Sequence, residues 1–197
     1  MKKASLKSRI FSYIFDSLIM FILIFLISLL FDQGRINELN KSLSDFFDLF
    51  VQKKITFDIL FNEATIIFQK LDLEKALLNV LNIVLILFYF VIVPYLWDGK
   101  TLGKKIFKIK VVRNDSEFLT MKNLIVRNII DTGIIYTLVS IILLYILSSK
   151  AYFIISISLS IIQIIILLVN VIMIKRRNDK RGLDDILSNT KTVEVIE

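Results

Sequence analysis

An uninterrupted apolar run, residues 10–31, constrains the fold of this chain more than any other feature. It is 22 residues long and carries one charged side chain, Asp16. At about 1.5 Å rise per residue, such a helix crosses a hydrocarbon core of about 30 Å. The run therefore predicts an integral membrane protein, and 56% of the chain is hydrophobic. No small-residue cleavage site follows the run, so we expect it to stay as an anchor.

Three later segments also have the length and apolar character of membrane spans: residues 76–97, 128–147 and 151–174. The first of them contains the only proline, Pro94, which lacks a backbone donor and should kink or end the helix. Its aromatic residues fit an interfacial belt: Tyr89, Tyr95 and Trp97. We interpret residues 1–197 as one all-α membrane domain, a bundle of about four transmembrane helices.

The two long connections are expected to carry short elements of their own. Residues 32–75 show two amphipathic helical patterns, which predict helices that lie on the membrane surface or cap the bundle. Thr101 is a suitable N-cap for a short basic helix over residues 102–108. After it, residues 109–113 and 117–120 flank a turn sequence and give a β-hairpin signal.

Charge distribution predicts the orientation. Lys and Arg number four in residues 1–9, eight in residues 98–127 and six from residue 175 onward, whereas residues 32–75 hold six against eight acids. The excess of Lys and Arg on cytoplasmic segments predicts that both termini and residues 98–127 are cytoplasmic. The net charge of +7 then orients the spans and favours contact with anionic lipid headgroups, not with nucleic acid.

Charged residues at or within the spans are candidates for a functional or structural cluster. Arg9 and Asp16 share a helical face but are about 10.5 Å apart along the axis, so each needs a partner elsewhere. Arg127 and Asp131 are four residues apart and can pair on one face. Acidic side chains in membrane helices usually face the protein interior, because exposure to lipid is costly.

Four motifs in order resemble the RDD family of bacterial membrane proteins, named for an arginine and two aspartates. Arg9 and Asp16 fit the first, and Arg127 fits the arginine before the third span. Two more are Thr101-Leu102-Gly103-Lys104-Lys105, followed by Val111-Val112, and the late Gly182-Leu183-Asp184-Asp185. The resemblance implies a bacterial cytoplasmic membrane location, and Asp185 as the second aspartate. The expected charged cluster is Arg9, Asp16, Arg127, Asp131 and Asp185.

This chain departs from the family pattern at two positions near its end. Asp184 stands where the family often has histidine, and Asn189 where glycine is common. If that histidine served proton transfer, this chain has lost it. The family's molecular role is largely unsettled, with transport, including cation/proton exchange, among the proposals. The resemblance implies a fold more firmly than a function.

Composition excludes several kinds of chemistry. With no cysteine and no histidine, the chain has no disulfide, no catalytic thiol, no imidazole base and none of the commonest zinc ligands. Gly99-Lys100-Thr101 imitates the end of a phosphate-binding loop, but Pro94 occupies the position of the required glycine. We therefore expect no enzyme, no cofactor and no metal site.

Two functional hypotheses remain. In the first, the protein is a non-catalytic membrane module (a scaffold, assembly factor or sensor) whose charged cluster fixes the helix packing. In the second, it is a small transporter, such as a cation/proton exchanger, in which Asp16 and Asp131 take protons or bind a cation. Four spans are few for a transporter, so the second hypothesis also implies a homo-oligomer. A water-filled path to Asp16 would favour transport, and a dry, fully paired cluster would favour the structural role.

Overall fold

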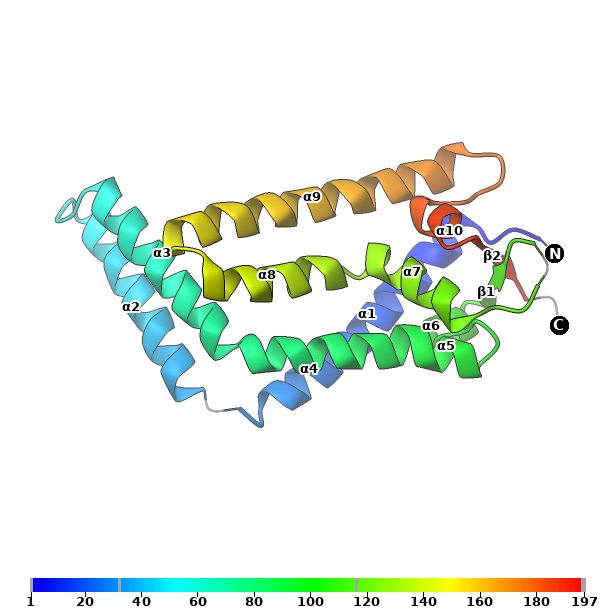
Figure 1. The fold of residues 1–197 in the computed structure, drawn as a ribbon, viewed down its shortest axis with the longest axis horizontal. Coiled ribbons are helices and arrows are strands. Elements are labelled where there is room, and N and C mark those ends of the chain that lie inside the picture. Colours follow the sequence, from blue (N-terminus) through cyan, green and yellow to red (C-terminus); the bar gives the residue numbers. More distant parts are fainter. Residues whose placement is uncertain (1, 32, 116, 196–197) are drawn as a thin grey trace.

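A computed structural model describes residues 2–31, 33–115 and 117–195. Its long helices run roughly along the longest axis, and both termini lie at one end (Figure 1). The predicted fold class is confirmed. Three described helices are long and apolar enough to cross a membrane, or four if one bent pair is a single span. The spans are α1 (Leu6–Ser28), α4 (Ala76–Leu87) with its continuation to Leu96, the pair α7 and α8, and α9 (Ser149–Arg176).

Helix α1 is buried against the rest of the protein along one narrow face. It begins at the N-cap Ser5, whose side chain accepts a hydrogen bond from Ser8 N at 3.0 Å. Its buried residues are Ser12, Asp16 and Met20, spaced four apart on one face. The other faces carry exposed apolar side chains suited to lipid. The polar positions of α1 are therefore the ones directed into the bundle.

The second span is irregular near its end. α4 passes into η1 (Phe88–Ile92), a π-helical turn, and then into α5 (Val93–Leu96). Pro94 has no N–H to donate to the Phe90 carbonyl four residues earlier, and that carbonyl accepts a hydrogen bond from Asn128 Nδ2 at 2.7 Å. The predicted disturbance at Pro94 is confirmed. Tyr89, expected in an aromatic belt, is instead buried inside the bundle.

The predicted third span, residues 128–147, is broken. α7 (Met121–Asp131) and α8 (Ile134–Ile146) meet at a bend of 67°. Thr120 and Asn123 form a capping box at the start of α7. Gly133, at the break, has φ +70°, a left-handed conformation that glycine adopts without steric strain. The break places Asp131 at the C-terminal end of a helix and not within a continuous span.

The first connection forms the predicted pair of amphipathic helices, α2 (Gly34–Val51) and α3 (Phe57–Glu74). They pack on each other through Leu39, Ile67 and Leu71, at the end of the bundle away from the termini (Figure 1). α3 also contacts α9, where Tyr152 donates a hydrogen bond to Asp72 at 2.7 Å. The pair thus ties the first connection to the last span.

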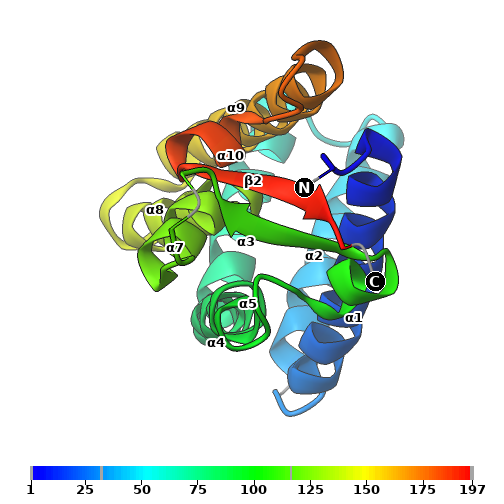
Figure 2. The ribbon, with the colours of Figure 1, turned by 90° about the vertical axis from the view of Figure 1, so that its right-hand side faces the viewer.

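The other end carries a terminal cap made of four short elements: α6 (Leu102–Ile106), β1 (Ile109–Arg113), α10 (Leu183–Leu187) and β2 (Thr190–Glu194). Figure 2 shows the two strands lying across the end of the bundle. They are antiparallel, with Val111 opposite Thr192. β1 is thus the first strand of the expected hairpin, but its partner is β2 and not residues 117–120. Thr120 is used instead to cap α7.

Candidate functional site

Two arginines and two aspartates form a buried cluster where the terminal cap meets the spans. Arg9 Nη1 donates to Asp185 Oδ2 at 2.6 Å, and Arg127 Nη1 donates to Asp185 Oδ1. Arg127 Nη2 pairs with Asp184 Oδ2 at 2.5 Å. The side chains of both arginines are 9% exposed, and those of the aspartates 0–1%. These four residues, which we call the Arg/Asp cluster, contain two positive and two negative charges.

The end of the chain folds back to bring the two aspartates to the spans. Both lie in the first turn of α10, and the Gly182 N–H donates to Asp185 Oδ2 at 3.3 Å. Arg181 holds the same segment by donating to the carbonyls of Asp185 and Thr190, both at 2.9 Å. Asp185 thus joins Arg9 and Arg127, as expected for a member of the charged cluster.

Burial alone would raise the pKa of the Asp185 carboxyl. The guanidinium groups of Arg127 and Arg9 outweigh burial and hold this pKa below its ordinary value. Asp185 is therefore ionised at neutral pH. Removing it would leave two guanidinium groups facing a single carboxylate.

Asp16 occupies a separate site. Its carboxylate is fully buried and accepts three hydrogen bonds, from Tyr89 Oη at 2.6 Å, Thr101 Oγ1 at 2.6 Å and Gly103 N at 2.8 Å. No ion pair joins it to an arginine within the described residues. The expected single cluster is therefore divided: Asp16 fixes the terminal cap to α1 through neutral donors, and Arg9 and Arg127 turn to the end of the chain.

The loop motif explains this arrangement residue by residue. Thr101 caps α6 and also binds Asp16. A Cβ added to Gly103 would lie 2.4 Å from the Ser12 carbonyl oxygen, so the close approach of α6 to α1 needs glycine there. Leu102 is partly exposed, and Lys105 lies over the Trp97 ring at 5.8 Å. Lys104 turns inward, and burial lowers the pKa of its ammonium group.

Asp131 does not pair with Arg127, although they are four residues apart. Arg127 is directed to α10, and Asp131 Oδ1 accepts a hydrogen bond from Asn170 Nδ2 of α9 at 2.9 Å. Asn170 in turn lies close to the tail, because its Oδ1 would be 2.0 Å from a Cβ added to Gly182. Asp131 is thus adjacent to the Arg/Asp cluster but held by a different partner.

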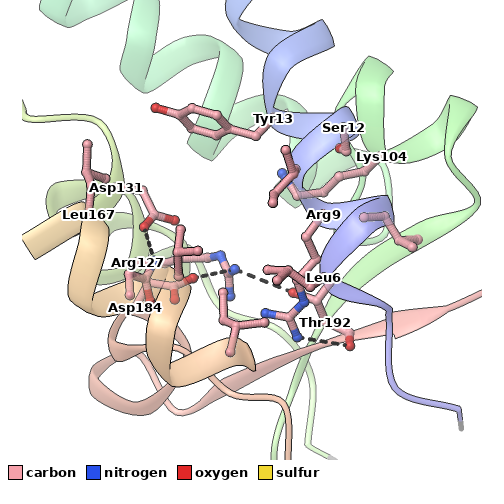
Figure 3. Close-up of a pocket in the computed structure, with 15 residues that line it drawn as sticks. Leu6, Arg9, Ser12, Tyr13, Lys104, Arg127, Asp131, Leu167, Asp184 and Thr192 are labelled. Carbon is pink, nitrogen blue, oxygen red and sulfur yellow. Dashed lines mark hydrogen bonds and ion pairs between the residues drawn. The ribbon is translucent and has the colours of Figure 1, made fainter. Parts of the chain in front are cut away.

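A cavity of about 350 Å³ lies between Lys104 and the side chains of Asp131, Arg127 and Asp184. Figure 3 shows Lys104 on one side of it and Asp131, Arg127 and Asp184 on the other, with Tyr13 at the top and its ring directed toward the side of Asp131. Its apolar lining comes mainly from α1 and α9: Leu6, Ile10, Leu167, Val171 and Ile174. Several buried polar atoms of lining residues have no hydrogen-bond partner among the described residues: Arg9 Nε, Ser12 Oγ, Asn170 Oδ1 and Asp184 Oδ1. In the described ranges, no group of three or more acidic side chains is placed to hold a metal ion.

The comparison with family models decides the family. The model of the RDD family matches residues 3–189. This chain belongs to the RDD family. Comparison with curated proteins and with solved structures gave no match. The predicted family is confirmed, and the protein has a buried Arg/Asp cluster, although Asp16 and Asp131 of the five predicted members lie outside it.

Sequence reasoning missed some residues of these sites. The aromatic pattern predicts an interfacial position for Tyr89, yet its hydroxyl donates to Asp16. Asp184 was noted only as a departure from the family pattern, although it pairs with Arg127. Asn170 was visible as a polar residue in an apolar span, and that signal alone could have marked it.

Proposed function

We propose that this RDD-family protein is a non-catalytic membrane module, a scaffold, assembly factor or sensor of the bacterial cytoplasmic membrane. The observation that carries the proposal is the buried cluster in which Arg9 pairs with Asp185 and Arg127 pairs with both Asp184 and Asp185. Such a cluster joins α1, α7 and the end of the chain, which are far apart in sequence. Buried ion pairs of this kind are better suited to fixing an arrangement than to adding net stability.

The Asp16 site supports the same reading. A carboxylate that accepts three hydrogen bonds at 2.6–2.8 Å and has no exposed surface is fully satisfied as an anion. A carrier that alternately binds and releases a proton or cation has to reach solvent at some stage, and no such contact accompanies Asp16. We therefore assign Asp16 to architecture.

The orientation is part of the proposal. Both termini and the terminal cap are cytoplasmic, and the basic segments of the cap contact anionic headgroups with about 1 kcal/mol per charge near the surface. The exposed apolar faces of the spans leave room for a homo-oligomer. Single cysteines in this cysteine-free chain test the orientation: on intact cells, an impermeant thiol reagent should label Gln52→Cys and leave Glu117→Cys and Asn178→Cys unlabelled. Labelling at position 117 would overturn the orientation.

A second candidate, a small cation/proton exchanger, is favoured by one observation: Asp131 lines the cavity. Of the two acids first considered for this role, Asp131 alone has such a location. Protein reconstituted in liposomes with an internal pH dye separates the two functions under imposed Na⁺ or K⁺ gradients. The module predicts proton movement no faster than in empty liposomes. A cation-driven flux that Asp131→Asn abolishes would replace the module by the exchanger.

A further inference from the structure

Some of the charged residues around the cavity are neutralised by ion pairs and others are not. Arg9 and Arg127 are neutralised by Asp184 and Asp185, so the charges of the Arg/Asp cluster balance. Two charged residues of the lining remain, Lys104 and Asp131. Neither has an ion-pair partner within the described residues.

These two charges face each other across the cavity. Figure 3 shows Lys104 and Asp131 on opposite walls. Within the part of the chain that the structure describes, the one hydrogen bond of Lys104 Nζ is a long one to Thr101 Oγ1, at 3.4 Å, and Nζ lies 6.0 Å from the centre of the Phe90 ring. Asp131 is also at the C-terminal end of α7, where the helix dipole adds partial negative charge. The cavity therefore has a positive wall and a negative wall.

Asp131 is the acceptor that the cavity offers to a ligand. Asn170 Oδ1 and Asp184 Oδ1 are buried and have no donor among the described residues. Both pack against Gly182, within 2.5 Å of the position of a Cβ added there, and Gly182 does not line the cavity. Asp131 does line it, and its carboxylate is suited to an ammonium group that carries several hydrogens.

The apolar lining connects the cavity to the lipid-facing surface. Ile10 of α1 and Val171 of α9 both line it, yet 39% and 40% of their surfaces are exposed. On either side the outer faces of α1 and α9 are apolar. A ligand with hydrocarbon chains can therefore leave its headgroup in the cavity and its chains against the outer faces of the two helices.

We propose that the cavity binds a phospholipid whose headgroup carries a primary ammonium beside its phosphate, the chemistry of phosphoethanolamine. The phosphate lies against Lys104, and the ammonium against the carboxylate oxygens of Asp131. A quaternary ammonium cannot donate to these acceptors, and a headgroup without nitrogen leaves Asp131 unpaired. A phosphate also restores the charge that burial disfavours on Lys104. The evidence for this lipid site is the cavity and its lining residues, so the site does not depend on the proposed function.

Native mass spectrometry of the purified, delipidated protein tests this site. Dioleoyl lipids with ethanolamine, choline or glycerol headgroups are titrated separately, so that only the headgroup differs. The ethanolamine lipid should bind about tenfold or more tightly than the other two, as expected for hydrogen bonds to charged groups. Lys104→Gln and Asp131→Asn should each weaken it by about tenfold or more. Lys105→Gln, one residue along the same helix but outside the lining, is the matched control and should bind as the wild type does.

Val171→Trp guards against loss of folding, because Val171 is 40% exposed and carries no charge. It should weaken binding by obstructing the rim while thermal stability stays unchanged. Equal binding of the ethanolamine and glycerol lipids, with Asp131→Asn having no effect, would overturn the proposal in favour of a site for anionic lipid. Glycerophosphoethanolamine, which has the same headgroup but no acyl chains, shows whether the ligand is a lipid or a free headgroup. If it binds as tightly as the lipid, and Val171→Trp does not weaken it, the site recognises this headgroup chemistry but its ligand does not come from the bilayer.

Discussion

Asp185→Asn is the sharpest test of the Arg/Asp cluster. The carboxylate contacts two guanidinium groups, with Arg9 at 2.6 Å, and is fully buried. An asparagine of the same shape keeps one acceptor oxygen but places an NH₂ group against the donors of the second guanidinium. Arg9 is then left with the Thr192 carbonyl at 3.4 Å. Breaking a buried pair in this way costs about 3–5 kcal/mol of unfolding free energy.

A double-mutant cycle identifies the group that is left unpaired. Adding Arg9→Gln to Asp185→Asn removes the uncompensated charge, and should restore about 0.5–3 kcal/mol. Adding Arg127→Gln should restore less, because Asp184 then loses its own cation. Stability in detergent is measured by denaturant and thermal unfolding, followed by Trp97 fluorescence. Equal recovery by the two arginine changes, or none by either, would refute the pairing described here.

The same variant predicts a pH dependence. Because the pKa of Asp185 is lower in the folded protein, its contribution is complete above the unfolded value of about 3.9. It is lost as the pH falls further, through the folded pKa. The stability difference between wild type and Asp185→Asn should therefore be constant from about pH 8 to pH 5 and should shrink below about pH 4. Asp179→Asn, which alters an exposed pair with Arg177, is the control and should leave stability unchanged.

Three further changes test the other sites by thermal unfolding. Tyr89→Phe removes a 2.6 Å hydrogen bond to the buried Asp16 carboxylate and should cost about 1.5–3 kcal/mol; no loss would show that water or another donor serves Asp16 equally well. Gly103→Ala should destabilise strongly, since its Cβ would lie 2.4 Å from the Ser12 carbonyl oxygen; a neutral result would contradict the close approach of α6 to α1. Gly133→Ala should cost about 1–2 kcal/mol for its left-handed backbone, although the added Cβ would make only ordinary contact with Gln163, at 3.6 Å; wild-type stability would mean that α7 and α8 form a straight helix.

Much of the fold could be predicted because apolar length and periodicity are local signals. Residues 10–31 and 151–174 are long enough to span a bilayer whatever surrounds them, and they correspond to α1 and α9. The break at Gly133 was not predictable in this way, because apolar residues continue on both sides of it. Its signal was a single glycine, which also occurs within straight membrane helices.

The partners of the charged residues could not be predicted from spacing. Arg127 and Asp131 are four apart on one helix, but α10 brings two carboxylates to Arg127, which pairs with them and not with Asp131. Similarly, the 117–120 segment follows β1 directly, yet β2 pairs with it from the other end of the chain. In both cases a contact of long sequence separation displaced a local one, and such contacts leave no periodic pattern.

The balance of the buried charges bears on whether the cavity binds a ligand. Arg9, Arg127, Asp184 and Asp185 neutralise one another, and Asp16 is satisfied by neutral donors, so the architecture of the terminal cap is electrostatically complete without Lys104 or Asp131. Neither of those two charges has an ion-pair partner within the described residues, and burying a charge without one is destabilising. Replacing both by neutral isosteres, Lys104→Gln with Asp131→Asn, should therefore leave the delipidated protein as stable as the wild type, or more so. A large loss of stability in that double variant would show that the two residues belong to the architecture, and the cavity would then need no ligand.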